Sequence, residues 1–155
     1  FHNSVHNEPS GYRGIATHSH HPSTSLCGFD WGFAIGLLEA AAQLQIDQQE
    51  VLLVAYDTPY PEPLRGVRPI TQPFGTALLF TRQRTNRTIA ELDVGMDARP
   101  QEISRMSDAA LEDLRTDNPC ARALPLLAAL ASPQPRSVTL ERDAGQTLCI
   151  SVRTF

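Results

Sequence analysis

The longest stretch of mainly apolar residues in the chain covers positions 33–46. It consists largely of strong helix formers and contains no proline, so it predicts a helix of about four turns. Its apolar side chains surround the helix axis instead of forming one stripe, which is typical of a helix buried on most sides. Asp30 precedes this stretch, and its carboxylate is placed to cap the first turn by accepting a backbone N–H.

An unbroken apolar run at positions 51–55 follows the predicted helix. Such a run without alternation is typical of a strand that is covered on both faces, as in parallel sheets. A helix followed by a buried strand predicts a βαβ unit and a layered α/β fold. Positions 59–73 then contain five prolines and predict a long ordered loop.

Four further segments have the pattern of strands. Positions 76–81 and 88–94 predict two strands that are joined through the polar turn at 82–87. Apolar residues alternate with polar ones at 137–142 and again at 146–153. An Asp-Ala-Gly sequence between these two segments supplies turn residues, so the C-terminal part predicts a β-hairpin.

Two more helices are predicted between these strands. Positions 107–116 carry acidic residues in their early turns, and Ser107 is placed to cap them. Positions 119–131 form the second candidate, with Pro119 suited to its first turn. Pro125 lies inside this segment and is expected to kink the helix or to split it.

Length, charge and cysteine content limit the number of domains, the kinds of partner and the compartment that the chain can have. At 155 residues the chain fits one domain with its own core, and its net charge of −4 disfavours binding to nucleic-acid phosphates. Its apolar runs are too short to span a bilayer. Three widely spaced cysteines without a CxxC pair favour a reducing cytoplasm. The chain begins at Phe1, so we expect a single domain over residues 1–155 that lacks an N-terminal part of its native protein.

A series of motifs gives the chain a family resemblance. In order they are SVHN (4–7), GYRGIAT (11–17), PSTSL (22–26), GFAIGLLEAAAQ (32–43), VLLVAYD (51–57), PFGTALLFT (73–81) and NPCARALPLLAALA (118–131). They resemble the N-terminal half of β-ketoacyl synthases, and in particular the short ketosynthase-like chain-length factors of aryl polyene clusters in Gram-negative bacteria. The resemblance implies an α/β, half thiolase-like fold with a mixed sheet, a buried central helix and a C-terminal β-hairpin.

The resemblance also bears on catalysis. An active ketosynthase has a cysteine at a tight strand-to-helix turn, where the helix dipole and backbone N–H groups favour its thiolate. Counting from the PSTSL motif, that position falls near Asp30, which cannot form a thioester. The family's two catalytic histidines belong to a C-terminal half that we expect this chain to lack, and all five histidines here lie at positions 2–21. The resemblance therefore implies no catalytic residue, with Cys27 as a weak candidate.

These implications lead to a functional hypothesis in which the protein needs no cofactor and binds no metal. The chain is expected to be a cytoplasmic, non-catalytic subunit that pairs with an active β-ketoacyl synthase and meets an acyl carrier protein. The bulky residues Phe29, Trp31 and Phe33 are predicted to gate the acyl tunnel. Arg65 and Arg68 are predicted to contact the carrier protein or its phosphopantetheine phosphate, the alternative being hydrogen bonds that fix their own loop.

One alternative makes the chain an enzyme. Cys27 could be the nucleophile of an acyltransferase or condensing enzyme, which would require a base and an oxyanion hole within reach. The simpler interpretation is a small apolar side chain in the core, which free cysteine usually is.

Two weaker alternatives use the polar N-terminal segment. The histidines at 18, 20 and 21 could bind zinc together with Cys27 or Asp30, although no second ligand pair with a familiar spacing follows. Ser4, His6 and Asn7 invite a hydrolase interpretation, but the chain contains no GxSxG motif. For the histidines the simpler interpretation is a polar loop at the surface or at a subunit interface. For Ser4 and Asn7 it is hydrogen bonds to the backbone around the turn that resembles the nucleophile turn.

Overall fold

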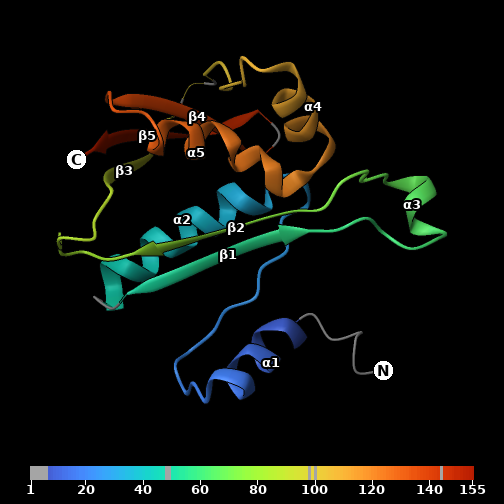
Figure 1. The fold of residues 1–155 in the computed structure, drawn as a ribbon, viewed down its shortest axis with the longest axis horizontal. Coiled ribbons are helices and arrows are strands. Elements are labelled where there is room, and N and C mark those ends of the chain that lie inside the picture. The colour runs from blue at the N-terminus through green and yellow to red at the C-terminus, as the bar shows by residue number, and fades with distance from the viewer. Residues whose placement is uncertain (1–6, 48–49, 98, 100, 144) are drawn as a thin grey trace.

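Helix α2 (Gly32–Asp47) lies at the centre of the computed structural model, which describes residues 7–47, 50–97, 99, 101–143 and 145–155. Figure 1 shows α2 between a two-stranded sheet and a second layer of strands and helices. The other elements are α1 (Glu8–Thr17), η2 (Phe29–Trp31), β1 (Val51–Asp57), α3 (Leu64–Val67), β2 (Phe74–Phe80), β3 (Ala90–Asp97), α4 (Ala109–Asp117), η3 (Pro119–Ala123), α5 (Leu124–Leu130), β4 (Arg136–Asp143) and β5 (Gln146–Thr154).

The core forms where α2 meets α5 and the β4–β5 pair. Phe33 and Leu37 from α2 are each 1% exposed, and they belong to one apolar cluster with Leu126 of α5 and Leu148 of β5. Gly36 lets α2 approach β1 closely, because a Cβ atom there would lie 3.0 Å from Cδ1 of Leu53. The central helix is therefore confirmed, but its last turn is not buried, since Ile46 is 77% exposed.

Strands β1 and β2 form an antiparallel pair, with Val51 opposite Phe80 and Asp57 opposite Phe74. Burial alternates along both strands, so one face packs on the core and the other faces outward. The prediction of a parallel strand covered on both faces is thus wrong, and so is the mixed sheet. An all-apolar run cannot reveal which of its faces will be left uncovered, because both faces carry the same kind of side chain.

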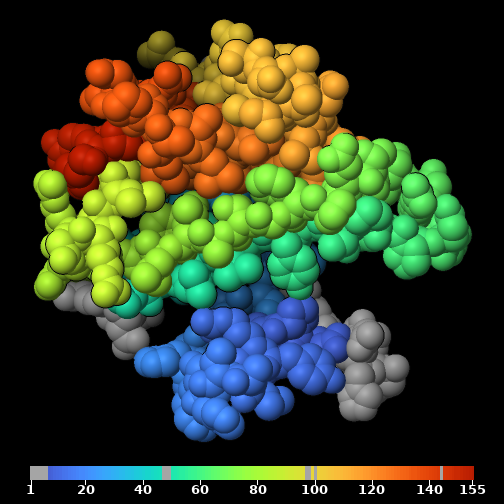
Figure 2. All heavy atoms as spheres, viewed as in Figure 1, coloured from blue at the N-terminus to red at the C-terminus, as the bar shows by residue number. Residues whose placement is uncertain are grey.

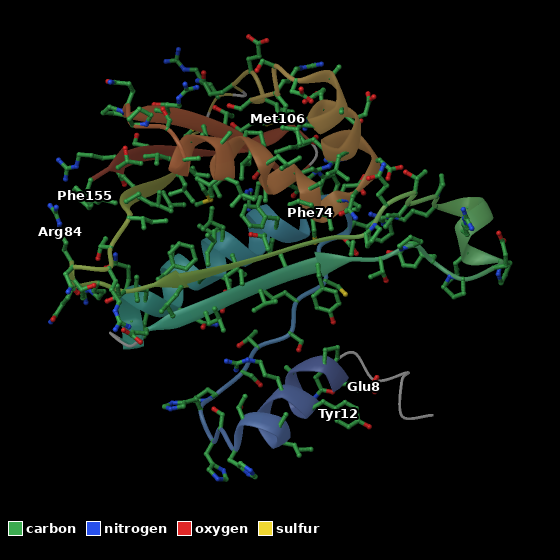
Figure 3. The ribbon with its side chains drawn as sticks, viewed as in Figure 1. Glu8, Tyr12, Phe74, Arg84, Met106 and Phe155 are labelled. Atoms are coloured by element: carbon green, nitrogen blue, oxygen red, sulfur yellow. The ribbon has the colours of Figure 1, made fainter. Side chains whose placement is uncertain are left out.

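The second sheet has the order β3-β5-β4 and is antiparallel throughout. The β4–β5 hairpin is confirmed, with Gly145 at φ 80° in its turn, where the missing Cβ removes the strain of a left-handed backbone. Strands β2 and β3 do not pair with each other, because the polar connection between them carries the chain from one sheet to the other. In Figure 3 Arg84 of this connection lies beside Phe155, and its guanidinium is 3.4 Å from the ring centroid.

The helices that follow β3 and precede β4 agree with the prediction except at one cap. Asp108, and not Ser107, is the N-cap of α4, and its carboxylate accepts a hydrogen bond from the backbone N–H of Leu111 (3.0 Å). The predicted split at Pro125 is confirmed, since η3 ends at Ala123 and α5 begins at Leu124. The proline falls in the first turn of the new helix, where its missing N–H costs nothing.

Helix α1 lies apart from the other elements, as Figures 1 and 2 show. None of its residues is buried, and Tyr12 and Ile15 are 54% and 72% exposed. Its Ser10 hydroxyl lies 3.1 Å from that of Ser25 in the segment that leads to α2. Among the described residues, none of the helices has the length and apolar character needed to cross a membrane.

Asn118 joins three parts of the fold from a fully buried position. Its side-chain N–H groups donate to the carbonyl oxygens of Asp57 (3.3 Å) and Gln72 (2.9 Å). Its side-chain oxygen accepts from the backbone N–H groups of Cys120 (2.9 Å) and Ala121 (3.3 Å). One amide thus ties the end of β1 and the segment before β2 to the first turn of η3.

Asp117 reinforces this junction from the neighbouring position. One carboxylate oxygen accepts from the backbone N–H of Thr71 (2.9 Å), from the Thr71 hydroxyl (2.8 Å) and from the backbone N–H of Gln72 (3.4 Å). Burial alone would raise the pKa of Asp117, but these hydrogen bonds outweigh it and hold the pKa below its ordinary value.

Replacement of Asn118 should therefore destabilise the whole chain. We expect Asn118→Ala to lower the free energy of unfolding by roughly 2–4 kcal/mol, because it leaves buried backbone groups without partners. Urea denaturation followed by circular dichroism measures this loss. The control is Asn86→Ala in the exposed connection between β2 and β3, which should change the midpoint little; equal effects of the two substitutions would contradict the role given to Asn118.

Candidate functional site

The turn that leads into α2 is sharply bent. At Gly28 a Cβ atom would lie 2.8 Å from both Cα of Gly32 and Cδ1 of Ile35, so only glycine fits. Phe29 follows with φ 52°, a left-handed conformation that is strained for a large side chain. The backbone N–H of Trp31 donates to the carbonyl of Gly28 (2.9 Å) and closes the 3-10 turn η2. Asp30 lies inside this turn, whose N-cap is Gly28, so the predicted capping role of Asp30 is not observed.

The carboxylate of Asp30 is engaged by two arginines. Arg68, from the proline-rich loop, donates a hydrogen bond to Oδ1, and Nη2 of Arg122 lies 3.4 Å from Oδ2. Arg122 comes from η3, and its Nη1 also donates to Oε2 of Glu141 on β4 (2.9 Å). These four side chains, which we call the Asp30 network, connect segments that are far apart in the sequence. All are partly exposed, so each ion pair by itself contributes little to stability.

The three predicted gate residues occupy very different surroundings. Phe29 is 77% exposed, and its ring lies 4.5 Å below the guanidinium carbon of Arg68. Trp31 is half-buried, and its buried indole N–H finds no acceptor in the part of the chain that the structure describes. Phe33 is 1% exposed and belongs to the core. Phe29 and Trp31 therefore belong to the turn itself, whereas Phe33 packs in the core one turn further along the chain.

The two predicted carrier contacts also differ. Arg65 is exposed on α3, whereas Arg68 binds Asp30 and covers Phe29. Arg68 therefore forms a contact within the chain, as the loop-fixing alternative predicted. Its partner, however, is the carboxylate of Asp30 and not a backbone carbonyl of its own loop. Sequence reasoning missed Arg122 and Glu141, and no local pattern could have found them, because each contacts a residue distant in the sequence.

The cysteines and histidines form no common centre in the described structure. Cys27 is exposed just before the turn, while Cys120 is buried. Burial, and then the neighbouring Asp57 carboxylate, raise the pKa of the Cys120 thiol. His18, His20 and His21 are exposed near α1. Within the described residues no group of three or more His, Cys, Asp or Glu side chains could hold a metal ion.

The hydrolase candidates can be placed only in part. Asn7 is exposed, and its backbone carbonyl accepts a hydrogen bond from the Ser10 hydroxyl (2.7 Å) at the start of α1. Ser4 and His6 lie outside the described residues. The described contacts of Asn7 are therefore those of a helix start.

Comparison with known proteins bears on the family of the chain. The family model described as "Beta-ketoacyl synthase, N-terminal domain" matches residues 1–145. The chain belongs to this family. No match was found among curated proteins or among solved structures. Membership of the ketosynthase family confirms the resemblance at the level of the N-terminal domain, and the mixed α/β architecture with antiparallel sheets is consistent with half of a thiolase-like domain.

In this ketosynthase-family chain the two thiols nearest α2 should differ strongly in reactivity. We expect iodoacetamide to modify exposed Cys27 at least about tenfold faster than Cys120 at neutral pH, because burial and the raised pKa keep the Cys120 thiol protonated and covered. Peptide mass spectrometry after timed labelling measures both rates. In urea the difference should disappear, and similar rates in the folded chain would contradict the observed packing.

Proposed function

We propose that the chain is a non-catalytic, ketosynthase-like subunit that pairs with an active β-ketoacyl synthase and shapes the acyl tunnel of the complex. The process would be aryl polyene or related polyketide-type fatty acid biosynthesis in the cytoplasm, as chain-length factors perform it. The observation that carries this proposal is Asp30, which occupies the turn before α2 and is paired with Arg68 and Arg122. A carboxylate in that position cannot accept an acyl group as a thioester, whereas the turn itself is retained.

An uncovered apolar surface supports the pairing. The outer face of the β1–β2 sheet presents Leu52, Val54, Tyr56 and Leu79, which are 43%, 50%, 52% and 62% exposed. Contiguous apolar surface of this kind usually marks a contact with another protein. The inner face of this sheet packs on α2 and the core, so a partner that covers the outer face would bury the apolar side chains that both strands still expose.

The carrier protein would approach from the proline-rich loop. Arg65 on α3 is exposed and remains the candidate for contact with an acidic carrier protein or its phosphopantetheine phosphate. Arg68 would contribute mainly by fixing the turn, because its guanidinium is already bound to Asp30.

The pairing can be tested by co-expression with an active β-ketoacyl synthase of an aryl polyene pathway. We expect a one-to-one complex in native mass spectrometry. Leu79→Glu should weaken it at least about tenfold, because it places a charge on the outer sheet face. The control is Ile89→Glu, an equally exposed position (64%) before β3, which should leave the complex intact. A wild-type chain that ignores the ketosynthase would refute the proposal, and equal effects of both variants would refute this choice of surface.

The tunnel role predicts a change in product length. Trp31→Ala and Phe29→Ala in the reconstituted complex should shift products to longer chains by whole two-carbon units, because each removes bulk beside the turn. Chromatography with mass spectrometry measures the distribution. Tyr12→Ala removes an exposed aromatic residue from the separate helix α1 and should leave the distribution unchanged. Unchanged products in both turn variants would exclude a gate at this turn.

A second candidate function, a Cys27-dependent acyltransferase or condensing enzyme, is favoured by one observation. The Cys27 thiol is exposed and lies three positions before Asp30, close to the turn. A thiol activated for acyl transfer should be alkylated far faster than a model thiol near neutral pH. Alkylation of Cys27 no faster than that of free cysteine would remove this alternative.

A further inference from the structure

Phe29 has a conformation and a location that require an explanation. Its side chain is 77% exposed, and its backbone is left-handed with φ 52°. Both features are unfavourable for phenylalanine, and such strain persists only where the surroundings enforce it. Gly28 and the hydrogen bond from Trp31 fix the path of the backbone, but they do not orient the exposed ring.

One side chain contacts both Phe29 and its neighbour in the turn. The guanidinium of Arg68 lies over the Phe29 ring at 4.5 Å and donates a hydrogen bond to the carboxylate of Asp30. A planar guanidinium can stack on an aromatic face while its edge N–H groups bind a carboxylate, which a lysine ammonium cannot do in the same way.

Arg68 is itself presented from a fixed base. Arg68 is the C-cap of α3, and its backbone N–H donates to the carbonyl of Leu64 (2.9 Å), the first residue of that helix. Two residues later Ile70 is buried in the core with 1% exposure, and Thr71 is held by the carboxylate of Asp117. The loop is therefore anchored to the fold just after the arginine, while α3 before it is exposed and contributes only the capped turn.

We propose that Arg68 is a positioning residue that sets the orientation of the Phe29 ring at the turn before α2, through a stack on the ring and an ion pair with Asp30. Arg122 pairs with Oδ2 of Asp30, the carboxylate oxygen that Arg68 does not bind. The pair with Arg122 limits the movement of the carboxylate and thereby helps to orient Arg68. The consequence for product length rests on the proposed tunnel function, but the positioning role does not.

Trp31 provides a readout that is independent of product formation. It is the only tryptophan of the chain and lies two positions after Phe29. In the full chain, Arg68→Met should increase the quenching of Trp31 fluorescence by acrylamide and shift the Trp31 emission. The reason is that the turn loses the guanidinium that lies over Phe29 and binds Asp30. Arg68→Lys should not restore the wild-type signal, since it keeps the charge without the planar stack. Arg65→Met is the control for this readout and should match the wild type.

The outcomes of this experiment separate the possibilities. Trp31 quenching and emission equal to the wild type in both Arg68 variants would overturn the positioning role. So would a change in Arg68→Met that is fully absent from Arg68→Lys. Far-ultraviolet circular dichroism verifies that each variant is folded. If Arg68→Met does not fold, Arg68→Lys carries the test, because it retains the cation beside Asp30.

Product analysis in the complex tests the consequence. Arg68→Met should broaden the distribution of product lengths, and the double variant with Phe29→Ala should not differ from Phe29→Ala alone. Additive effects of the two substitutions would overturn the claim that Arg68 acts through Phe29. If Phe29→Ala leaves the products unchanged, Phe29 is not a gate residue, while the Trp31 signal still decides whether Arg68 orders the turn.

Discussion

The buried amide of Asn118 is the interaction on which the arrangement of the site depends. It binds the carbonyl oxygens at the end of β1 and before β2, and it caps the first turn of η3. The loop that carries Arg68 ends at this junction, and the helix that carries Arg122 begins there. Both arginines that reach Asp30 are thus placed by one fully buried side chain. A buried amide with every polar atom paired fixes such a junction because any displacement would leave a polar group unsatisfied.

The turn before α2 is strained but firmly held. Its Gly28 cannot carry a Cβ atom, and its Phe29 adopts a left-handed backbone. Its Asp30 is paired with the guanidinium groups of two arginines. Strain of this kind is usually kept for a function, and with Asp30 in the network that function would be to shape a surface.

The distribution of apolar surface fits a chain that is completed by another protein. One face of the β1–β2 sheet contributes Leu53 and Phe80 to the core, while Val54 and Leu79 on the other face are at least half exposed. The same α2 that fills the core also begins at the turn with the Asp30 network. A partner that covers the sheet would therefore be coupled to the turn through the central helix.

Local sequence patterns are sufficient to predict the elements whose causes are local. The central helix, the break at Pro125 and the C-terminal hairpin follow from propensity and turn residues, and the order of the motifs along the chain indicates the family. The tertiary structure sets which face of residues 51–57 is uncovered, and that Phe33 is buried while Phe29 is exposed. It alone brought the Asp30 network together, because its members come from four segments and a charge carries no local sign of its distant partner. Contacts of this kind follow from how α2, η3 and the sheets pack, and packing depends on the whole chain at once.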